Sequence, residues 1–200
     1  MKIDLPIVNS EKEKYEKVHS DSDYGCGPRQ VKDLEELTFP FSKRFKEIIE
    51  ENNDCLDIAC GGGTVMNYVN QLGCTPTGVD ISENAIRKVS KDFNTFVASA
   101  HELPFEDDSF DITYFLDGME HVPEEIENQS IKESFRVAKN YVCHAIALCS
   151  SCRNGVELHC NLKSYDKWKE IFDNVAVDSD FELDLEHYRN DTIHLIYKKI

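Results

Sequence analysis

Three consecutive glycines, Gly61–Gly63, follow an apolar run at Cys55–Ala59 and precede a helical pattern over Thr64–Leu72. A strand that ends in glycines before a helix lets a ligand approach bare backbone at the carboxyl edge of a sheet. A dinucleotide fingerprint would need a further glycine where Met66 stands, and a P-loop would need a Gly-Lys-Ser/Thr that does not follow. The loop therefore predicts a ligand site, and its spacing disfavours a nicotinamide cofactor.

An acidic residue, Asp80, ends the next predicted strand, Pro76–Asp80. A carboxylate at this position can accept hydrogen bonds from both ribose hydroxyls of an adenosyl group. Glycines at a strand–helix turn can also serve tight packing alone, and the acidic strand end weakens that alternative. The two features together favour a nucleoside-containing ligand.

A third motif lies within Ala98–Asp111, where Leu103-Pro104-Phe105 precedes the Ser109-Phe110-Asp111 that opens another apolar run. With the glycine loop and Asp80, this motif resembles the class I S-adenosylmethionine-dependent methyltransferase family over about residues 50 to 140. The resemblance implies a Rossmann-like fold and S-adenosylmethionine as the cofactor. The cofactor-binding residues that it implies are Asp57, Ala59, Cys60, Gly61 and Gly63 around the methionine part, Asp80 at the ribose, Ile81, Ser99, Ala100 and His101 at the adenine, and also Phe115 and Tyr24.

Two residues depart from the family pattern. Ala59 replaces the usual first glycine, and Ser99 stands where many relatives have an aspartate that accepts a hydrogen bond from the adenine amino group. We expect the first change to be mild because alanine is small. We expect the second to weaken the adenine contact or to route it through water.

Asp117, Glu120 and His121 follow the predicted strand Phe110–Leu116 at positions that share one face of a helix. The segment is similar to the Glu-x-x-Glu-His of ubiquinone-pathway O-methyltransferases, in which these side chains serve a divalent ion. These three residues are the catalytic candidates, and no residue is assigned as a metal ligand. Three interpretations stay open: His121 is a general base, the three side chains bind a divalent cation, or Glu120 is solvated and His121 only caps the pocket.

The residues Phe115–Gly118 stand where enzymes of this fold that methylate nucleobase amino groups carry an Asn/Asp-Pro-Pro-aromatic turn. The net charge of −16, from 22 basic and 38 acidic side chains, also repels phosphate backbones and anionic lipids. We therefore expect methyl transfer to a small soluble acceptor, with a hydroxyl oxygen preferred, by a monomer or homodimer without a nucleic-acid or membrane partner. The alternatives are a non-catalytic S-adenosylmethionine-binding sensor or partner subunit, and aminopropyl transfer on the same fold.

Eight cysteines occur in a chain whose first residues, Met1–Pro6, contain no apolar run of signal-peptide length. We therefore expect a cytoplasmic protein with reduced thiols. Cys149 and Cys152, with the following His159-Cys160, are residue types that bind zinc. The spacing to His159 is shorter than in common zinc modules, so ordinary packing or exposed thiols are favoured.

Two further segments supply candidates for the walls of the pocket. Relatives often fold an amino-terminal extension over the cofactor as a lid, and the aromatic rings of Tyr15, His19 and Tyr24 could shield a sulfonium there. The alternative is a loosely packed surface helix. Near the other end of the chain, the acceptor-wall candidates are His159, Asn161 and Trp168, the last of which could equally belong to a helix core.

Short apolar runs alternate with helical patterns along most of the chain, which predicts a parallel sheet with right-handed crossovers. We expect an α/β fold with three layers, doubly wound, whose seven-stranded and mostly parallel sheet ends in an antiparallel C-terminal hairpin. It forms a single domain, 1–200, with an N-terminal extension or lid (1–43), a cofactor-binding core (44–150) and a substrate-side segment with the final hairpin (151–200). A first helix is expected from the helical spacing of Phe41, Phe45, Ile48 and Ile49. Later helices are expected at Thr64–Leu72, Glu83–Asp92 with Ser82 as its N-cap, Asn128–Lys139 and Ser164–Phe172, and the later strands at Thr95–Ala98, Tyr141–Leu148, Val175–Phe181 and Thr192–Tyr197.

Overall fold

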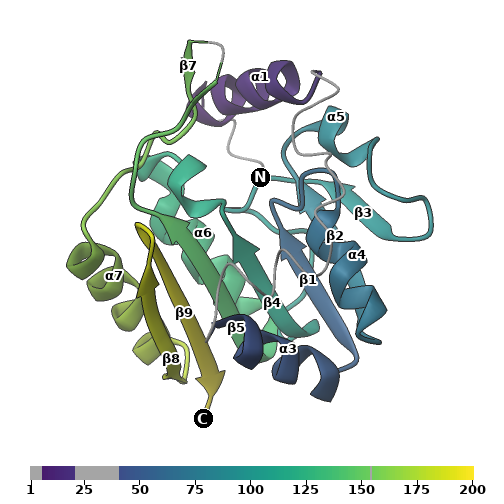
Figure 1. Ribbon diagram of the computed structural model, residues 1–200, viewed down its shortest axis with the longest axis vertical. Helices are drawn as coiled ribbons and strands as arrows, with labels where there is room; N and C mark the ends of the chain where they lie inside the picture. Colours follow the sequence, from purple (N-terminus) through teal and green to yellow (C-terminus); the bar gives the residue numbers. More distant parts are fainter. Residues whose placement is uncertain (1–5, 21–40, 154) are drawn as a thin grey trace.

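A computed structural model describes residues 6–20, 41–153 and 155–200, and a seven-stranded sheet forms its centre (Figure 1). The strands lie in the order β3-β2-β1-β4-β5-β9-β8. The first five pair in parallel, and β9 pairs antiparallel with both β5 and β8. This confirms the predicted sheet and its antiparallel C-terminal hairpin. The strand bounds are β1 Asp54–Ile58, β2 Thr75–Asp80, β3 Asn94–Val97, β4 Phe110–Leu116, β5 Ala138–Ala147, β8 Phe181–Arg189 and β9 Thr192–Lys199.

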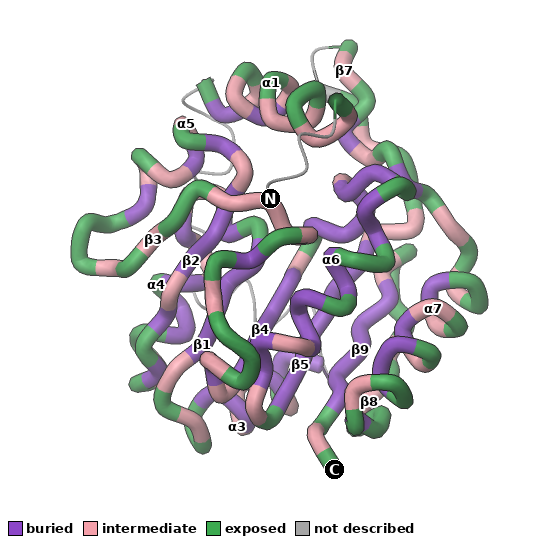
Figure 2. The backbone as a smooth tube through the Cα atoms, turned by 180° about the vertical axis from the view of Figure 1, so that it is seen from behind, coloured by how far each residue is buried: buried purple, intermediate pink, exposed green. Residues whose placement is uncertain are grey.

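Helices cover both faces of the sheet and give the expected three layers. Helices α3 and α4 pack on one face, whereas α6 and α7 pack on the other, so that α6 comes to the front when the molecule is turned (Figure 2). Figure 2 also shows that the buried backbone follows the central strands. The helix bounds are α1 Pro6–Ser20, α3 Phe41–Glu51, α4 Thr64–Gln71, α5 Glu83–Ile86, α6 Glu124–Arg136 and α7 Tyr165–Asp178, with a short 3-10 helix η1 at Met119–His121 and a two-stranded ribbon of β6 Cys152–Arg153 and β7 Val156–Glu157.

Alternating side chains of the central strands pack into two separate hydrophobic cores, one on each face of the sheet. In β1, Leu56 and Ile58 belong to the core beneath α6 and α7, whereas Cys55 belongs to the core beneath α3 and α4. Successive side chains of a strand point to opposite faces, so a sheet covered on both sides has apolar residues at nearly every position. The burial of both faces fixes the register of the strands, and hence the line along which their carboxyl ends lie.

The structure corrects three predicted elements. The segment Val175–Phe181 is not a strand, because α7 continues to Asp178 and the hairpin strand begins only at Phe181. Val175 and Ala176 are buried two turns after Trp168 and one turn after Phe172, which is helical spacing. Helix α6 starts and ends a turn earlier than predicted, and α5 is only four residues long, although Ser82 caps it as expected, accepting a hydrogen bond from the Ala85 amide at 3.1 Å.

Within the described ranges, none of the helices combines the length and the apolar character needed to cross a bilayer.

Candidate functional site

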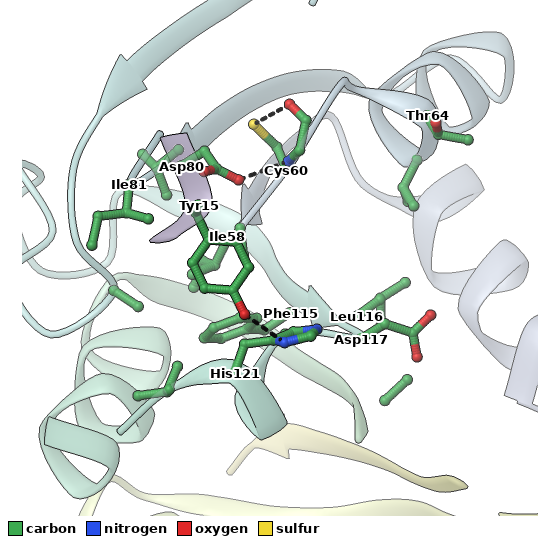
Figure 3. A pocket seen from close by; sticks show the side chains of 18 of the residues that line it. Tyr15, Ile58, Cys60, Thr64, Asp80, Ile81, Phe115, Leu116, Asp117 and His121 are labelled. Atoms are coloured by element: carbon green, nitrogen blue, oxygen red, sulfur yellow. Dashed lines mark hydrogen bonds between the residues drawn. The ribbon is translucent and has the colours of Figure 1, made fainter. Parts of the chain in front are cut away.

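A cavity of about 800 Å³ opens at the carboxyl edge of the parallel strands (Figure 3). Its floor is the loop between β1 and α4 together with the end of β2, and its far wall is the end of β4 with η1. Helix α1 lies across its mouth, between α5 and β7 (Figure 1). The cavity therefore occupies the place where strand ends of an open α/β sheet hold ligands.

The glycine loop turns sharply because several of its residues have left-handed backbone conformations. Ala59, Gly61 and Gly63 have φ of 59°, 53° and 79°. A Cβ on Gly63 would lie 3.0 Å from a methyl carbon of Val89, so a side chain there would be both strained and crowded. The Cys60 amide donates to the Val79 carbonyl at 2.9 Å and ties the loop to β2. The backbone of the loop is thus presented to the cavity on a fixed support.

Asp80 is held at the edge of the cavity by backbone donors. Its Oδ2 accepts from the Gly61 amide and its Oδ1 from the Ser82 amide, both at 2.9 Å. Burial raises the pKa of Asp80, and these two hydrogen bonds act in the opposite direction. A carboxylate has about four acceptor positions, so Asp80 retains capacity for the two hydroxyls of a ribose. The cavity size, the bare loop and this carboxylate fit an adenosyl ligand.

Eight of the residues predicted to bind the cofactor line this cavity. Asp57 lies beneath it, buried in β1, where burial and the neighbouring Asp80 raise its pKa well above the usual value. Gly63 and His101 are not lining residues, although His101 Nδ1 lies 2.7 Å from Ser99 Oγ and orients that side chain. Tyr24 lies outside the described residues. The lining residues among the predicted set are Ala59, Cys60, Gly61, Asp80, Ile81, Ser99, Ala100 and Phe115.

The three catalytic candidates occupy different environments. Asp117 and His121 line the cavity, whereas Glu120 is buried behind η1 and is not a lining residue. Burial, with a smaller effect from the charge of Asp117, raises the pKa of Glu120 to about 8. Burial lowers the pKa of His121 to about 4, so its ring is neutral at pH 7. Asp117 has φ of 54°, a turn conformation in place of the helix expected at this point.

The hydrogen bonds of His121 determine where its ring proton lies. His121 Nδ1 is 3.0 Å from the carbonyl oxygen of Leu158 and 2.7 Å from the hydroxyl of Tyr15 (Figure 3). A carbonyl can only accept, so the neutral ring satisfies this contact when Nδ1 carries the proton and donates it. The other ring nitrogen, Nε2, then has a free lone pair.

Helix α1 bridges the two sides of the cavity, and its Tyr15 and His19 line it. The Tyr15 hydroxyl donates to the Leu158 carbonyl at 3.1 Å. On the opposite side, the Glu16 carboxylate accepts from the amides of Glu83 and Asn84 at 2.5 and 3.1 Å. The sequence predicts Tyr15 and His19 at this place but not Glu16, because only the folded chain brings Glu16 next to α5.

The three acceptor-wall candidates, His159, Asn161 and Trp168, are not among the residues that line the cavity. Trp168 is fully buried in the core between α6 and α7, as the helix-core alternative predicts. Asn161 is buried and donates to the Val122 carbonyl at 3.1 Å. His159 reaches His121 instead, with ring centroids 4.7 Å apart. Lining residues that the sequence analysis missed come from distant elements and carry no local motif: Phe41, Ser42, Arg189, Asn190, Thr192 and His194.

The cysteines do not form the zinc site considered from the sequence. Cys149, Cys152 and Cys160 are exposed free thiols. Among the described residues, the group of three metal-type ligands contains His159 but none of these cysteines. That group joins His159 to Glu120 and His121, and it does not include Asp117.

Residues 56–142 match a protein-family model described as a methyltransferase domain. The ubiquinone/menaquinone biosynthesis C-methyltransferase UbiE of Rickettsia massiliae is 34% identical over an alignment of 118 positions that covers 49% of this chain and 46% of that protein. The chain spans about half the length of the curated relatives that it matches.

Two solved structures share the fold across most of the chain. A protein from Pyrococcus horikoshii has a TM-score of 0.71 at 19% identity, over 86% of this chain and 93% of that one. Magnesium protoporphyrin IX methyltransferase from Synechocystis, solved with bound S-adenosylmethionine, has a TM-score of 0.65 at 14% identity, over 100% of both chains.

Proposed function

The chain belongs to the class I S-adenosylmethionine-dependent methyltransferases, and we propose that it transfers a methyl group from this cofactor to a small acceptor. The observation that carries the proposal is the cavity floor, where the bare backbone of the Ala59–Gly62 loop and the carboxylate of Asp80 lie together. The loop would take the methionine part of the cofactor, and Asp80 would accept from the ribose hydroxyls. Ile81 would pack on the adenine, whose edge Ser99 and Ala100 would line.

The far wall would face the reacting end of the cofactor. S-adenosylmethionine supplies a methyl group activated by a positively charged sulfur. Transfer is an in-line displacement, so the protein contributes alignment, exclusion of water and an acceptor in the right protonation state. Phe115 and Asp117 would form the wall at the sulfur, and the neutral ring of His121 would present Nε2 to the acceptor side.

We propose that the acceptor carries an ionisable hydroxyl group. As the methyl–sulfur bond breaks, the sulfur keeps the bonding electrons, and the new methyl bond forms to the acceptor, whose hydroxyl proton passes to His121. Removing that proton activates the hydroxyl oxygen itself, and in a phenol-like acceptor it also activates a ring carbon. Methylation of that ring carbon is the alternative to oxygen methylation, because several relatives are named as C-methyltransferases.

Helix α1 would act as a lid over the bound cofactor. It contacts α5 through Glu16 and the segment at Leu158 through Tyr15, so it crosses the mouth of the cavity. Exclusion of water by a closed lid favours methyl transfer over side reactions. The rings of Tyr15 and His19 are among the groups of α1 that line the space the cofactor would fill.

Calorimetric titration with S-adenosylhomocysteine tests this assignment without knowledge of the acceptor. Wild-type protein should bind it, and Asp80→Asn should weaken binding by about 100-fold, because two hydrogen bonds to a charged acceptor are lost or weakened. Asp178→Asn, which changes an exposed acid on α7, should bind as the wild type does. Absence of binding to the wild type at high micromolar concentration would contradict the proposed function.

A further inference from the structure

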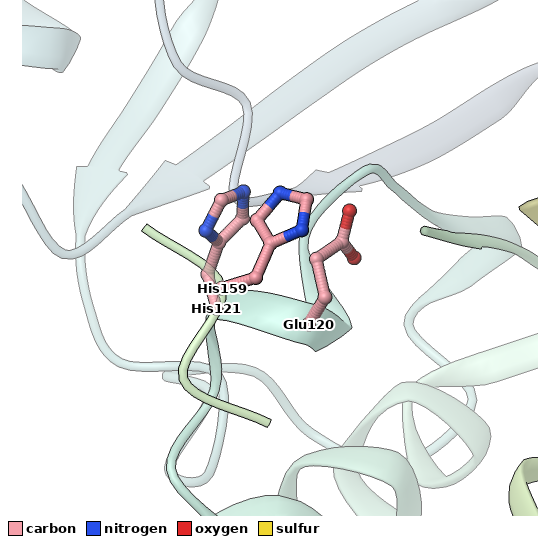
Figure 4. Close-up of side chains that lie close together, drawn as sticks. All are labelled: Glu120, His121 and His159. Carbon is pink, nitrogen blue, oxygen red and sulfur yellow. The ribbon is translucent and has the colours of Figure 1, made fainter. Parts of the chain in front are cut away.

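Three side chains meet behind the cavity wall: Glu120, His121 and His159 (Figure 4). Glu120 and His121 are neighbours in η1, whereas His159 comes from the segment that follows β7. One carboxylate oxygen and one nitrogen of each ring all lie within 4.8 Å of one another. Figure 4 shows the two rings side by side next to the carboxylate.

The buried carboxylate of Glu120 has one oxygen without a hydrogen-bond partner among the described residues. The residue is 1% exposed, and the oxygen concerned is Oε2. A buried polar atom without a partner is costly, and most such atoms in native proteins are bonded to protein, water or an ion. The free oxygen of Glu120 is therefore available to a ligand.

Both histidines use Nδ1 for a hydrogen bond to a carbonyl, and neither Nε2 has a hydrogen-bond partner among the described residues. His121 Nδ1 donates to the Leu158 carbonyl at 3.0 Å, and His159 Nδ1 donates to the Cys149 carbonyl at 2.5 Å. In each case the carbonyl can only accept, so the proton of the neutral ring is on Nδ1. A histidine that ligates a metal usually donates its other ring N–H to a carbonyl or carboxylate, which fixes the tautomer.

The backbone holds the His159 segment against η1. The Asn161 amide donates to the Glu120 carbonyl at 3.1 Å, and the Cys160 thiol donates to the His121 carbonyl at 3.3 Å. The two segments are far apart in sequence, so these contacts exist only because the fold brings them together. The three side chains thus converge from two fixed pieces of backbone.

We propose that Glu120, His121 and His159 form a binding site for a borderline divalent cation of the zinc type. Two imidazole nitrogens and one carboxylate oxygen are a donor set that such cations prefer, and three protein ligands leave a coordination position open. Ligand atoms around a tetrahedral zinc are about 3.4 Å apart, since each bond is about 2.0–2.1 Å long. Small side-chain rotations, chiefly of the partly exposed His159, would bring the three ligand atoms from their present separations of up to 4.8 Å to the separations in a zinc site. The site does not use the residues assigned to the cofactor. It does take Nε2 of His121, so His121 would serve as the proposed base only in the cation-free protein.

Titration of the metal-stripped full-length protein with Co²⁺ tests the site, because Co²⁺ replaces zinc and gives visible absorption that reports its geometry. We expect one equivalent to bind with tetrahedral-type bands. His159→Ala and Glu120→Gln should each weaken binding by at least about 100-fold, since even residues that only support a ligand change affinity by 10–100-fold. His187→Ala, a histidine on β8 outside the group, should have no effect.

Two further variants separate this site from its rivals. Asp117→Asn should leave Co²⁺ binding unchanged, whereas a site of Asp117, Glu120 and His121 would lose it. A triple serine variant of Cys149, Cys152 and Cys160 should also keep it. The proposal is overturned if the wild type binds no Co²⁺, if His159→Ala binds as the wild type does, or if the cysteine variant abolishes binding. Because no cofactor is added, these outcomes are independent of the proposed methyl transfer.

Discussion

The cavity has two halves that are built in different ways. The cofactor half is lined by Ala59–Gly62 with Asp80 and Ile81, where we propose that the cofactor binds, and the proposed acceptor half is lined by Asp117, Gly118, His121 and Val122, with Leu158–Asn161 behind them. In the cofactor half, the bonds join loops and strand ends that are neighbours in the sheet, from backbone to backbone or from backbone to the Asp80 carboxylate. In the acceptor half, several bonds run from side chains to carbonyls of segments that are distant in the sequence.

The contacts that fix each half show the contrast. The Cys60 amide donates to the Val79 carbonyl at 2.9 Å, a bond between the ends of two paired strands. The Tyr15 hydroxyl and His121 Nδ1 lie 2.7 Å apart, although the two residues are separated by 106 positions in the sequence. A site made of backbone has a short motif, because residue types such as glycine are needed for the backbone path itself. A site made of distant side chains has none, and this explains why the cofactor is easier to infer than the acceptor.

The largest expected effect is the loss of the core that supports the acceptor half. Trp168 is fully buried in α7, a few residues after the segment that carries His159. Trp168→Ala should lower the free energy of unfolding by about 3–5 kcal/mol, since it removes a large side chain from a packed core. Urea unfolding followed by circular dichroism measures this change.

Val177 on the same helix provides the control, because its side chain is 76% exposed. Val177→Ala should change the free energy of unfolding by less than about 0.5 kcal/mol. If Trp168→Ala lowers the free energy of unfolding no more than the control does, the core around Trp168 does not stabilise the acceptor half.

The two halves should also respond to pH in opposite directions. Burial lowers the pKa of His144, which packs against Phe172 below the acceptor half, to about 3. The unfolded chain binds a proton at His144 below about pH 6.5 while the folded chain does not, so stability is lost as pH falls from there toward 3. Burial raises the pKa of Asp57 below the cofactor half, so its contribution is present at low pH and is lost as pH rises.

Unfolding free energies measured at pH 7 and pH 5 check both signs. His144→Gln should remove about 2 kcal/mol of the acid-induced loss, because one group changes stability by about 1.4 kcal/mol per pH unit in this window. The other histidines whose pKa values burial lowers to about 4, His19, His121 and His194, should retain the remaining acid sensitivity. Asp57→Asn should change the profile in the opposite sense. An unchanged profile in either variant would show that the burial of that group is not what sets the pH dependence.

The smallest expected effect tests the backbone path of the cofactor half. Ala59 has φ of 59°, a conformation that costs an alanine about 1–2 kcal/mol and a glycine almost nothing. Ala59→Gly should raise the free energy of unfolding by roughly 0.5–1 kcal/mol, after the greater freedom of glycine in the unfolded chain is subtracted. Thermal unfolding measures the change. Ala176→Gly inside α7 should have the opposite sign, and a destabilised Ala59→Gly would contradict the strained loop.

The sequence predicted those elements whose signals are local. Asp80 at the end of β2 and Ser82 as the cap of α5 were predicted from residue type and position, and both are where they were expected. The strand predicted at Val175 was wrong because an apolar alternation of a few residues is shared by strands and by buried helix faces, and only packing on α6 decides between them. The same limit applies to the site.

The parts of the site that the sequence could not predict are long-range. His159 was considered as a zinc ligand with nearby cysteines, whereas the fold brings it to Glu120 and His121. The carbonyl of Leu158 orients both Tyr15 and His121, and a carbonyl is present at every residue, so no residue type marks it. The chemical character of these side chains could be predicted from the sequence, but the groups that they contact could not.

A crystal structure of the protein with S-adenosylhomocysteine tests the two-half description most directly. We predict that the ribose hydroxyls lie within hydrogen-bond distance of the Asp80 carboxylate, that the methionine part follows the Ala59–Gly62 loop, and that the sulfur faces Asp117 and His121. A ligand that lies elsewhere, or whose ribose is turned away from Asp80 and toward His121, would contradict the assignment of the two halves.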